Sequence, residues 1–371
     1  MDKTASVFIT LVVYNALLIG VGLWAKNRNR DVQDYFLAGR GLGPWVAAIS
    51  ASASSSSAWT LLGVSGAAYA WGLPALWIFP ATVGGFLINW AWVAPRLKKL
   101  AAKERAVTLS EVIAPVTIGE RRKLILRIAA LIIVFCFTFY VASQFEAAGK
   151  AFESVFGLSK QNSIVIGAAI VLVYTILGGF WAVSVTDSIQ GLLMAVASLV
   201  LPIVALSAVG GVGGLSEGLR QVGNEGSPIV AGGLVSLFFV LGLMGLGLQY
   251  PGQPHVVNRF MALKDDGALR QGQIIAMTWA VLVYSGMLLL GLCARVLFAD
   301  LDDSEQVLFK VAGDLLPAVI AGVMVAAVLS AIMSTADSQL LVAASAISYD
   351  WNLASRDGQA SVKGFRTTVL A

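Results

Sequence analysis

The sequence predicts an all-α membrane protein. Of its 371 residues, 58% are hydrophobic and 12% are charged, about half the charged share of a typical soluble domain. The mean hydropathy is +0.81, and the apolar residues gather in stretches of the roughly 20 residues that a helix needs to cross a bilayer. The 25 basic residues fall mainly between these stretches. Membrane topology therefore explains the net charge of +4, and nucleic acid is not an expected partner.

We expect nine membrane spans. The first has no convincing small-residue cleavage site, so it is interpreted as a retained helix rather than a removed signal peptide. Membrane lipid is the expected surrounding of all nine, and the polar stretch 96–123 is expected to be a cytoplasmic loop. The predicted spans are 5–25, 45–71, 74–95, 124–149, 162–182, 186–208, 229–250, 272–299 and 316–347.

The distribution of basic residues predicts the orientation. With the N-terminus outside, most lysines and arginines lie on the inner side, whereas the outer loop 300–305 is acidic. This matches the rule that cytoplasmic loops are rich in basic residues. We therefore predict a multi-pass protein of the plasma (inner) membrane with its N-terminus outside and its C-terminus inside. Arg259 and His255 are expected in a solvated inner loop.

The second span contains a serine run that opposes a closed helix. Residues 49–59 place six serines within eight positions, from Ser50 to Ser57. Serine competes with the backbone for hydrogen bonds and is a mediocre helix former. Unwound backbone at membrane depth persists only beside a cavity or ligand. We expect an interruption here, of the kind that binds solutes and ions in transporters.

A second interruption is predicted in the seventh span. Residues 242–254 contain four glycines, which loosen a helix, and two prolines that end it. Two interrupted helices five spans apart indicate an inverted five-plus-five repeat. The prediction is one domain, 1–371, with an extra N-terminal helix at 5–25, a first repeat at 45–208 and an incomplete second repeat at 229–371. The second repeat would need two more helices, and 362–371 resembles the opening of one.

The ninth span carries a polar stripe. Ser330, Ser334, Asp337 and Ser338 fall on one helical face, with Thr335 beside them. Hydroxyls and freed carbonyls can bind a small hard cation, which favours sodium, although small polar residues also simply join membrane helices. Asp337 favours function, because an acid at the bilayer centre costs about 3 kcal/mol.

Other polar residues allow two interpretations. Asp187 follows Ser184 in a capping-box pattern, so it either caps a helix or supplies a second carboxylate beside a cation path. Tyr140, Ser143 and Gln144 share a face that could line a solute cavity, and Trp59 could stack on a solute. The sequence contains no nucleophile and base pair, phosphate loop or metal-ligand cluster. We therefore predict neither an enzyme nor a cofactor.

These residues resemble the sodium:solute symporter family, and most of all its proline-transporting members. The fold expected from this resemblance is an extra N-terminal helix and a ten-helix inverted-repeat core. The matching segments are 34–40 (DYFLAGR), 49–59 (ISASASSSSAW), 178–187 (GGFWAVSVTD), 252–255 (GQPH) with 259–261 (RFM), and 333–340 (MSTADSQL).

The resemblance also implies site residues. One sodium ion would be held by carbonyls of Ala53, Ser56 and Ala331 and by the hydroxyls of Ser334 and Thr335. A second sodium, present in some members, matches Asp187, Ser334, Asp337 and Ser338. Trp59 and Tyr140 match residues of the solute pocket. Two positions depart from the proline-type pattern, since Ser55 replaces an aspartate and Leu246 replaces a tryptophan.

The expected function is sodium-coupled symport of a small organic solute, with proline or a related amino acid as the first candidate and another small organic acid as an alternative. Two other functions remain open at this point. The chain could be the transporter-like sensor domain of a signalling histidine kinase, or a proton-coupled transporter that uses Asp187 and Asp337.

Overall fold

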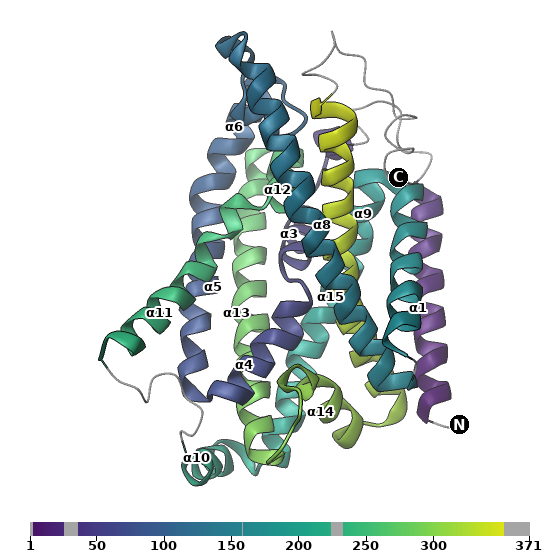
Figure 1. The fold of residues 1–371 in the computed structure, drawn as a ribbon, viewed down its shortest axis with the longest axis vertical. Helices are drawn as coiled ribbons and strands as arrows, with labels where there is room; N and C mark the ends of the chain where they lie inside the picture. Colours follow the sequence, from purple (N-terminus) through teal and green to yellow (C-terminus); the bar gives the residue numbers. More distant parts are fainter. Residues whose placement is uncertain (1–2, 26–35, 158, 224–232, 352–371) are drawn as a thin grey trace.

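The computed structural model describes residues 3–25, 36–157, 159–223 and 233–351. It is almost entirely helical, with most long helices running along one direction (Figure 1). Within the described residues, six helices are long and apolar enough to cross a membrane, and they match the third, fourth, sixth, seventh, eighth and ninth predicted spans. These are Leu73–Glu104, Arg121–Glu153, Gly179–Ala208, Gly233–Gly252, Asp266–Leu297 and Ala318–Asp350.

The other three predicted spans are also helical. The first is α1 (Lys3–Ala25), and the second is split into shorter helices. The fifth span joins the sixth in α9 (Lys160–Ala208), with only Gly179 outside helical geometry, at φ 61° and ψ −167°. Glycine reaches this region without the steric cost of a Cβ. The chain therefore passes from one span to the next without the loop that the sequence led us to expect.

The serine run interrupts the second span as predicted. Helix α3 (Pro44–Ser55) ends where Ser56 leaves helical geometry, and the chain resumes as a π-helical turn (Trp59–Gly63) followed by α4 (Val64–Trp71). Pro44 at the first position starts α3 with its φ already fixed. The break at 56–57 lies in the middle of the molecule, between α3 and α4 (Figure 1). It exposes the last carbonyls of α3 to new partners.

The seventh span breaks later than expected. Helix α11 (Gly233–Leu248) continues through its glycines, and the chain then makes a tight turn at Tyr250–Gly252 before α12 (Pro254–Ala262). Gly247 permits close packing rather than unwinding, because a Cβ there would lie 2.1 Å from the carbonyl oxygen of Ala81, whereas a Cβ on Gly242 or Gly245 would meet open space. Pro251 and Pro254 begin the two new turns, as their fixed φ favours.

Helix α15 (Ala318–Ser345) forms the centre of the structure. It packs against α1, α3, α8 and α9, and nearly all of its residues from Ala321 to Ser345 are buried. The remaining helices surround it or cap the ends. They are α5 (Ile78–Leu87), α6 (Ala94–Glu104), α7 (Leu109–Ile113), α8 (Arg121–Phe156), α10 (Gly211–Val222), α13 (Asp266–Leu297) and α14 (Val307–Leu315).

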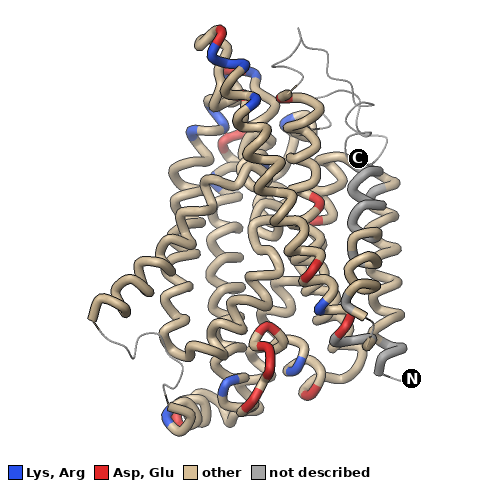
Figure 2. Tube along the Cα trace, viewed as in Figure 1, with Lys and Arg blue, Asp and Glu red and all other residues tan. Residues whose placement is uncertain are grey.

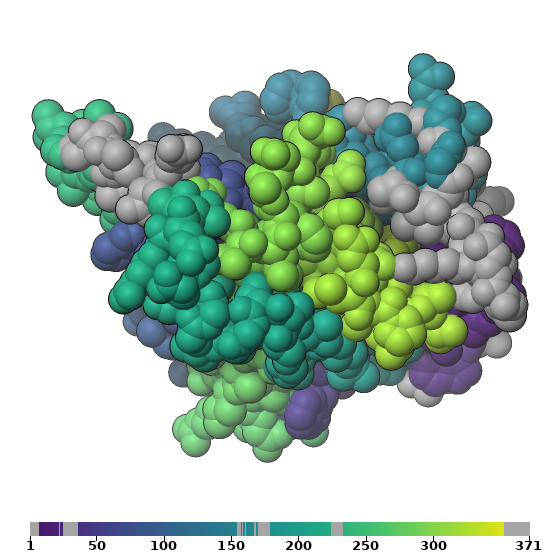
Figure 3. Space-filling view, turned by 90° about the horizontal axis from the view of Figure 1, so that it is seen from below, coloured from purple at the N-terminus to yellow at the C-terminus, as the bar shows by residue number. Residues whose placement is uncertain are grey.

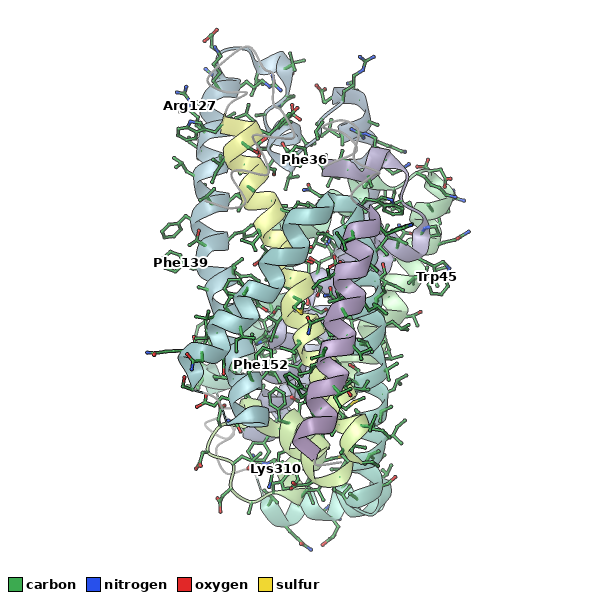
Figure 4. All side chains as sticks on the ribbon, turned by 90° about the vertical axis from the view of Figure 1, so that its right-hand side faces the viewer. Phe36, Trp45, Arg127, Phe139, Phe152 and Lys310 are labelled. Carbon is green, nitrogen blue, oxygen red and sulfur yellow. The ribbon has the colours of Figure 1, made fainter. Side chains whose placement is uncertain are left out.

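The two ends of the bundle differ in charge. Lysines and arginines gather at the upper end around α6 and the start of α8, and acidic residues at the lower end near 300–305 (Figure 2). Seen from below, the segment between α13 and α15 covers the middle of the lower face (Figure 3). Large apolar side chains such as Trp45 and Phe139 point outward (Figure 4) and are 64% and 66% exposed. This is the distribution expected of a bilayer-spanning surface.

Several residues used for the predicted orientation lie outside the described part of the chain, as does the segment 362–371. The basic ones are Lys26, Arg28, Arg30, Arg356, Lys363 and Arg366.

Candidate cation site and solute cavity

An oxygen-rich cluster lies where α15 crosses the end of α3. The Thr335 hydroxyl is 3.0 Å from the Ser54 carbonyl oxygen and 3.1 Å from that of Ala331. The Ser334 hydroxyl is 3.3 Å from the Ala53 carbonyl oxygen and 3.4 Å from that of Ala331. Each hydroxyl has a single hydrogen but faces two acceptors. The cluster is fully buried, and its two hydroxyl hydrogens face three carbonyl oxygens, those of Ala53, Ser54 and Ala331.

The break in the second span makes this cluster possible. The Ala53 and Ser54 carbonyls belong to the last turn of α3. The last carbonyls of a helix lack the full set of backbone amides that would otherwise bond to them, so they can accept from other groups. The Ser56 amide donates to the Ala53 carbonyl at 3.1 Å, so Ser56 lies at the same place. Of the residues predicted for the first sodium, Ala53, Ala331, Ser334 and Thr335 contact one another directly. Ser56, whose carbonyl was the predicted ligand, is joined to them by its amide, and the Ser54 carbonyl, which was not predicted, contacts Thr335.

Asp187 does not cap a helix. It lies inside α9 well beyond Gly179, and its Oδ2 accepts from Arg259 Nη2 at 2.5 Å and from the Ser50 hydroxyl at 2.9 Å. The Ser338 hydroxyl lies 3.4 Å from the same oxygen and 2.6 Å from Arg259 Nη2. All four side chains are at most 1% exposed. The capping interpretation is wrong, because the carboxylate forms a buried ion pair far from the helix start.

The prediction of a solvated inner loop around His255 and Arg259 is also wrong. Both side chains are buried, at 2% and 1% exposure, because α12 packs against α3, α6 and α15. Arg259 also donates to Ser50 at 2.7 Å and to the His255 carbonyl. One sequence signal was available: an acid at membrane depth, such as Asp187, calls for a partner of opposite charge.

The residues predicted for a second sodium are only partly assembled. Asp187 and Ser338 are neighbours, but the Arg259 guanidinium contacts both of them. Asp337 is fully buried on the same helix as Ser334 and Ser338. A cation that used Asp187 would therefore compete with the positive charge of Arg259.

A cavity of about 490 Å³ opens on the other side of the break. It is lined by all four residues predicted for solute binding, Ser55, Trp59, Tyr140 and Leu246. Sequence reasoning also placed Ser143 and Gln144 there but missed the remainder of the lining. The full set adds Ser57, Ala58, Leu62, Ser143, Gln144, Glu146, Ala147, Lys150, Gln249, Tyr250 and Glu305.

Polar contacts tie the cavity wall to the break. The Tyr140 hydroxyl donates to Ser57 Oγ at 3.2 Å, and the Gln144 side-chain oxygen accepts from the Ala58 amide at 3.2 Å. Toward the lower end, Lys150 forms ion pairs of 2.6 Å with Glu305 and 3.2 Å with Asp303. The segment 53–60 therefore contributes to the oxygen cluster with its first residues and to the cavity with its later ones.

A multi-helix membrane fold with a cavity and an oxygen cluster on one broken helix defines a transporter class. The family model "Sodium:solute symporter family" matches residues 35–364. The chain belongs to the sodium:solute symporter family, and it is a multi-pass protein of the plasma membrane rather than an enzyme.

Individual relatives agree with this assignment. The chain is 36% identical over 361 residues to a sodium/proline symporter of Escherichia coli, which covers 94% of this chain and 71% of the relative. It is also 36% identical over 349 residues to an osmoregulated proline transporter of Bacillus subtilis, with coverage of 93% and 70%. A solved structure of a Na⁺-coupled sialic acid symporter in a substrate-bound outward-open state has the same fold. Its TM-score is 0.82 at 19% identity, covering 98% of this chain and 79% of that one.

Proposed function

We propose that the protein couples the inward movement of sodium to the uptake of a small organic solute, with proline or a related amino acid as the first candidate. The observation that supports this most is the shared use of segment 53–60 by the oxygen cluster and the cavity. An ion that orders the break would also order one wall of the cavity. Binding of the ion then favours binding of the solute, which is thermodynamic coupling.

The sodium site in this proposal uses carbonyls of Ala53, Ser56 and Ala331 with the hydroxyls of Ser334 and Thr335. Neutral oxygens bind a hard cation by replacing its water, whereas they bind a proton poorly. Each sodium ion that enters gains about 2.3 kcal/mol per 100 mV of membrane potential. One ion per cycle is therefore enough to drive substantial accumulation of solute.

The solute pocket in this proposal is the cavity beside Trp59 and Tyr140. Its volume of about 490 Å³ leaves room for a small amino acid. An aromatic ring at Trp59 and the hydroxyl of Tyr140 supply one apolar and one polar wall. Ser55 and Leu246 also line the cavity, so the two departures from the proline-type pattern lie where they would alter solute preference.

We further propose that Asp337 compensates for the absence of an acid at Ser55. Asp337 is a buried carboxylate one turn from the Ser334 hydroxyl and would supply the negative charge that a bound sodium ion favours. Asp337→Asn is then expected to raise the sodium concentration that gives half-maximal uptake by roughly tenfold, a change of 1.4 kcal/mol. Unchanged sodium dependence would contradict this compensation. Asp187 and Ser338 can join a second ion site only if Arg259 moves away.

The proposed architecture is an extra N-terminal helix, α1, followed by an inverted five-plus-five core, with the N-terminus outside. The basic upper end of Figure 2 would then face the cytoplasm. The cavity, whose mouth bears Lys150 and Glu305, would open toward the outside. The cluster around Asp187 and Arg259 would close the inner side.

The test is uptake of labelled proline by the protein reconstituted in proteoliposomes. An inward sodium gradient is expected to drive accumulation, and a proton gradient without sodium is expected not to. Unlabelled amino acids and small organic acids compete in parallel, to define the solute. Uptake that responds only to the proton gradient would contradict sodium coupling.

A further inference from the structure

Tyr284, a tyrosine outside all of the predicted sites, contacts both interrupted spans. It lies in α13 and is fully buried. Its hydroxyl oxygen is 2.5 Å from the hydroxyl of Tyr250, in the turn that follows α11. It is also 3.3 Å from Oγ1 of Thr60, in the π-helical turn that follows the serine break. Tyr284 therefore links the two places where the membrane helices are interrupted.

The three hydroxyls form one chain. Each has a single hydrogen, so a given hydroxyl donates in one direction and accepts in the other. Tyr250 and Thr60 are buried, at 2% and 1% exposure. Hydrogen bonds in such surroundings strengthen one another and are costly to leave unmade. The hydroxyl of Tyr284 thus connects Thr60 to Tyr250.

The helix that carries Tyr284 is held firmly in place. A Cβ on Gly286 would lie 2.0 Å from the Ser198 carbonyl oxygen, and one on Gly291 would lie 2.1 Å from that of Ser65. These close backbone contacts fix α13 against α9 and α4. The ring of Phe86 packs against Tyr250 at 4.7 Å and Tyr284 at 6.2 Å between ring centroids. Tyr284 is therefore held in place by the packing of α13, and its hydroxyl contacts the interruption in each of the two spans.

Tyr284 acts on the cavity through its neighbours. Tyr250 lines the cavity, and Thr60 follows Trp59, which lines it from the other interrupted span. Tyr284 itself is not part of the lining. We propose that Tyr284 is a positioning residue whose hydroxyl holds these two cavity walls, one from each interrupted span, in register for the solute. The role in solute binding depends on the function proposed above. The link from Tyr284 to Tyr250 and Thr60 depends only on the observed contacts.

The first test measures the position of the walls without any solute. Leu246→Cys places a thiol in the cavity, in a Cys136→Ala background that removes the exposed native cysteine and keeps the buried Cys293. Its rate of reaction with a membrane-impermeant thiosulfonate is recorded in sodium-free buffer. Tyr284→Phe removes the hydroxyl contacts to both Tyr250 and Thr60, and one buried contact alone, at about 1 kcal/mol, predicts that the reaction becomes at least about fivefold faster. Tyr69→Phe is the matched control, since its hydroxyl contacts the Phe298 carbonyl near the lower end, and it is expected to leave the rate unchanged. An unchanged rate in Tyr284→Phe would overturn the proposal.

The second test measures proline uptake in proteoliposomes. Tyr284→Phe and Thr60→Val are each expected to raise KM about fivefold with little change in maximal rate, and the double variant is expected to be no worse than either single one, because both break the same chain. Additive effects would overturn the proposal. Thr60→Val covers the case in which Tyr284→Phe fails to fold. If the parent protein takes up no proline, the proposed function fails while the labelling test still decides the role of Tyr284.

Discussion

The two sides of the serine break are built in opposite ways. On the lower side the chain leaves a cavity of about 490 Å³, with aromatic and hydroxyl side chains around it and partly buried ion pairs at Lys150. On the upper side the space is filled by the ion pair of Asp187 and Arg259, with Ser50 and Ser338 bonded to it. Both charged groups are completely buried there.

This difference shows which side is open. A buried ion pair costs several kcal/mol of desolvation per ion and is stable only with excellent geometry and further hydrogen bonds, which Asp187 and Arg259 have. Ion pairs that keep contact with water, such as the partly buried ones of Lys150, contribute far less. The upper side is thus a firm closure and the lower side a weak one. In the proposed orientation, the structure is open to the outside and closed to the cytoplasm.

Replacing Arg259 is expected to have the largest effect on the stability of the protein, because it removes the cation of the buried ion pair on the upper side. Arg259→Gln leaves the Asp187 carboxylate buried without its cation, which is expected to cost about 3–5 kcal/mol. Thermal unfolding of the purified protein measures the loss. The double variant Asp187→Asn, Arg259→Gln should recover much of it, since no buried charge then remains. Arg96→Gln, an exposed arginine, is the control and should change stability by less than about 1 kcal/mol. Equal melting temperatures for Arg259→Gln and Arg96→Gln would contradict the firm closure.

Thr335→Val tests the oxygen cluster between the two sides. The change keeps the shape of the side chain and removes one oxygen, a contact to a charged ligand worth about 1.5–3 kcal/mol. The sodium concentration for half-maximal uptake should rise about 10- to 100-fold. Thr82→Val is the matched control, because that buried hydroxyl bonds only within its own helix, to Ile78 and Phe79. A similar shift in both variants would show that Thr335 does not contact the ion.

The smallest effect is expected at the cavity mouth. Lys150→Gln removes two ion pairs whose side chains are 30–44% exposed, so its effect should stay within about 1 kcal/mol and diminish at high salt. Initial uptake rates at low and high ionic strength measure it. A loss of uptake of tenfold or more that persists at high salt would contradict the weak lower closure.

Much of this arrangement could be predicted from the sequence. The serines at 50–57 predicted the break, because serine competes with helical hydrogen bonds. The spacing of Ser334, Thr335 and Asp337 predicted a polar face on the ninth span. These features are local patterns of residue type and period. The pairing of that face with the break, and the places of Ser55 and Leu246 beside the solute, were instead implied by the family resemblance; Ser55, Trp59, Tyr140 and Leu246 do line one cavity. Such patterns survive without knowledge of the tertiary contacts.

The parts that could not be predicted depend on contacts distant in sequence. Arg259 appeared to be a loop cation, and only the packing of α12 brings it to Asp187, 72 residues away in the chain. Tyr284 is one of many aromatic residues in apolar helices until Tyr250 and Thr60 are seen beside it. The glycines of α11 suggested unwinding, whereas Gly247 allows close packing. Composition alone does not distinguish these two uses of glycine.

The most direct test of the account is a measurement of proline affinity with and without sodium, and of sodium affinity with and without proline, on the purified protein. If the break joins the two sites, sodium should strengthen proline binding severalfold to about 100-fold, and proline should strengthen sodium binding by the same factor. Proline binding of equal affinity in sodium and in choline would contradict the claim that the broken helix couples the two sites.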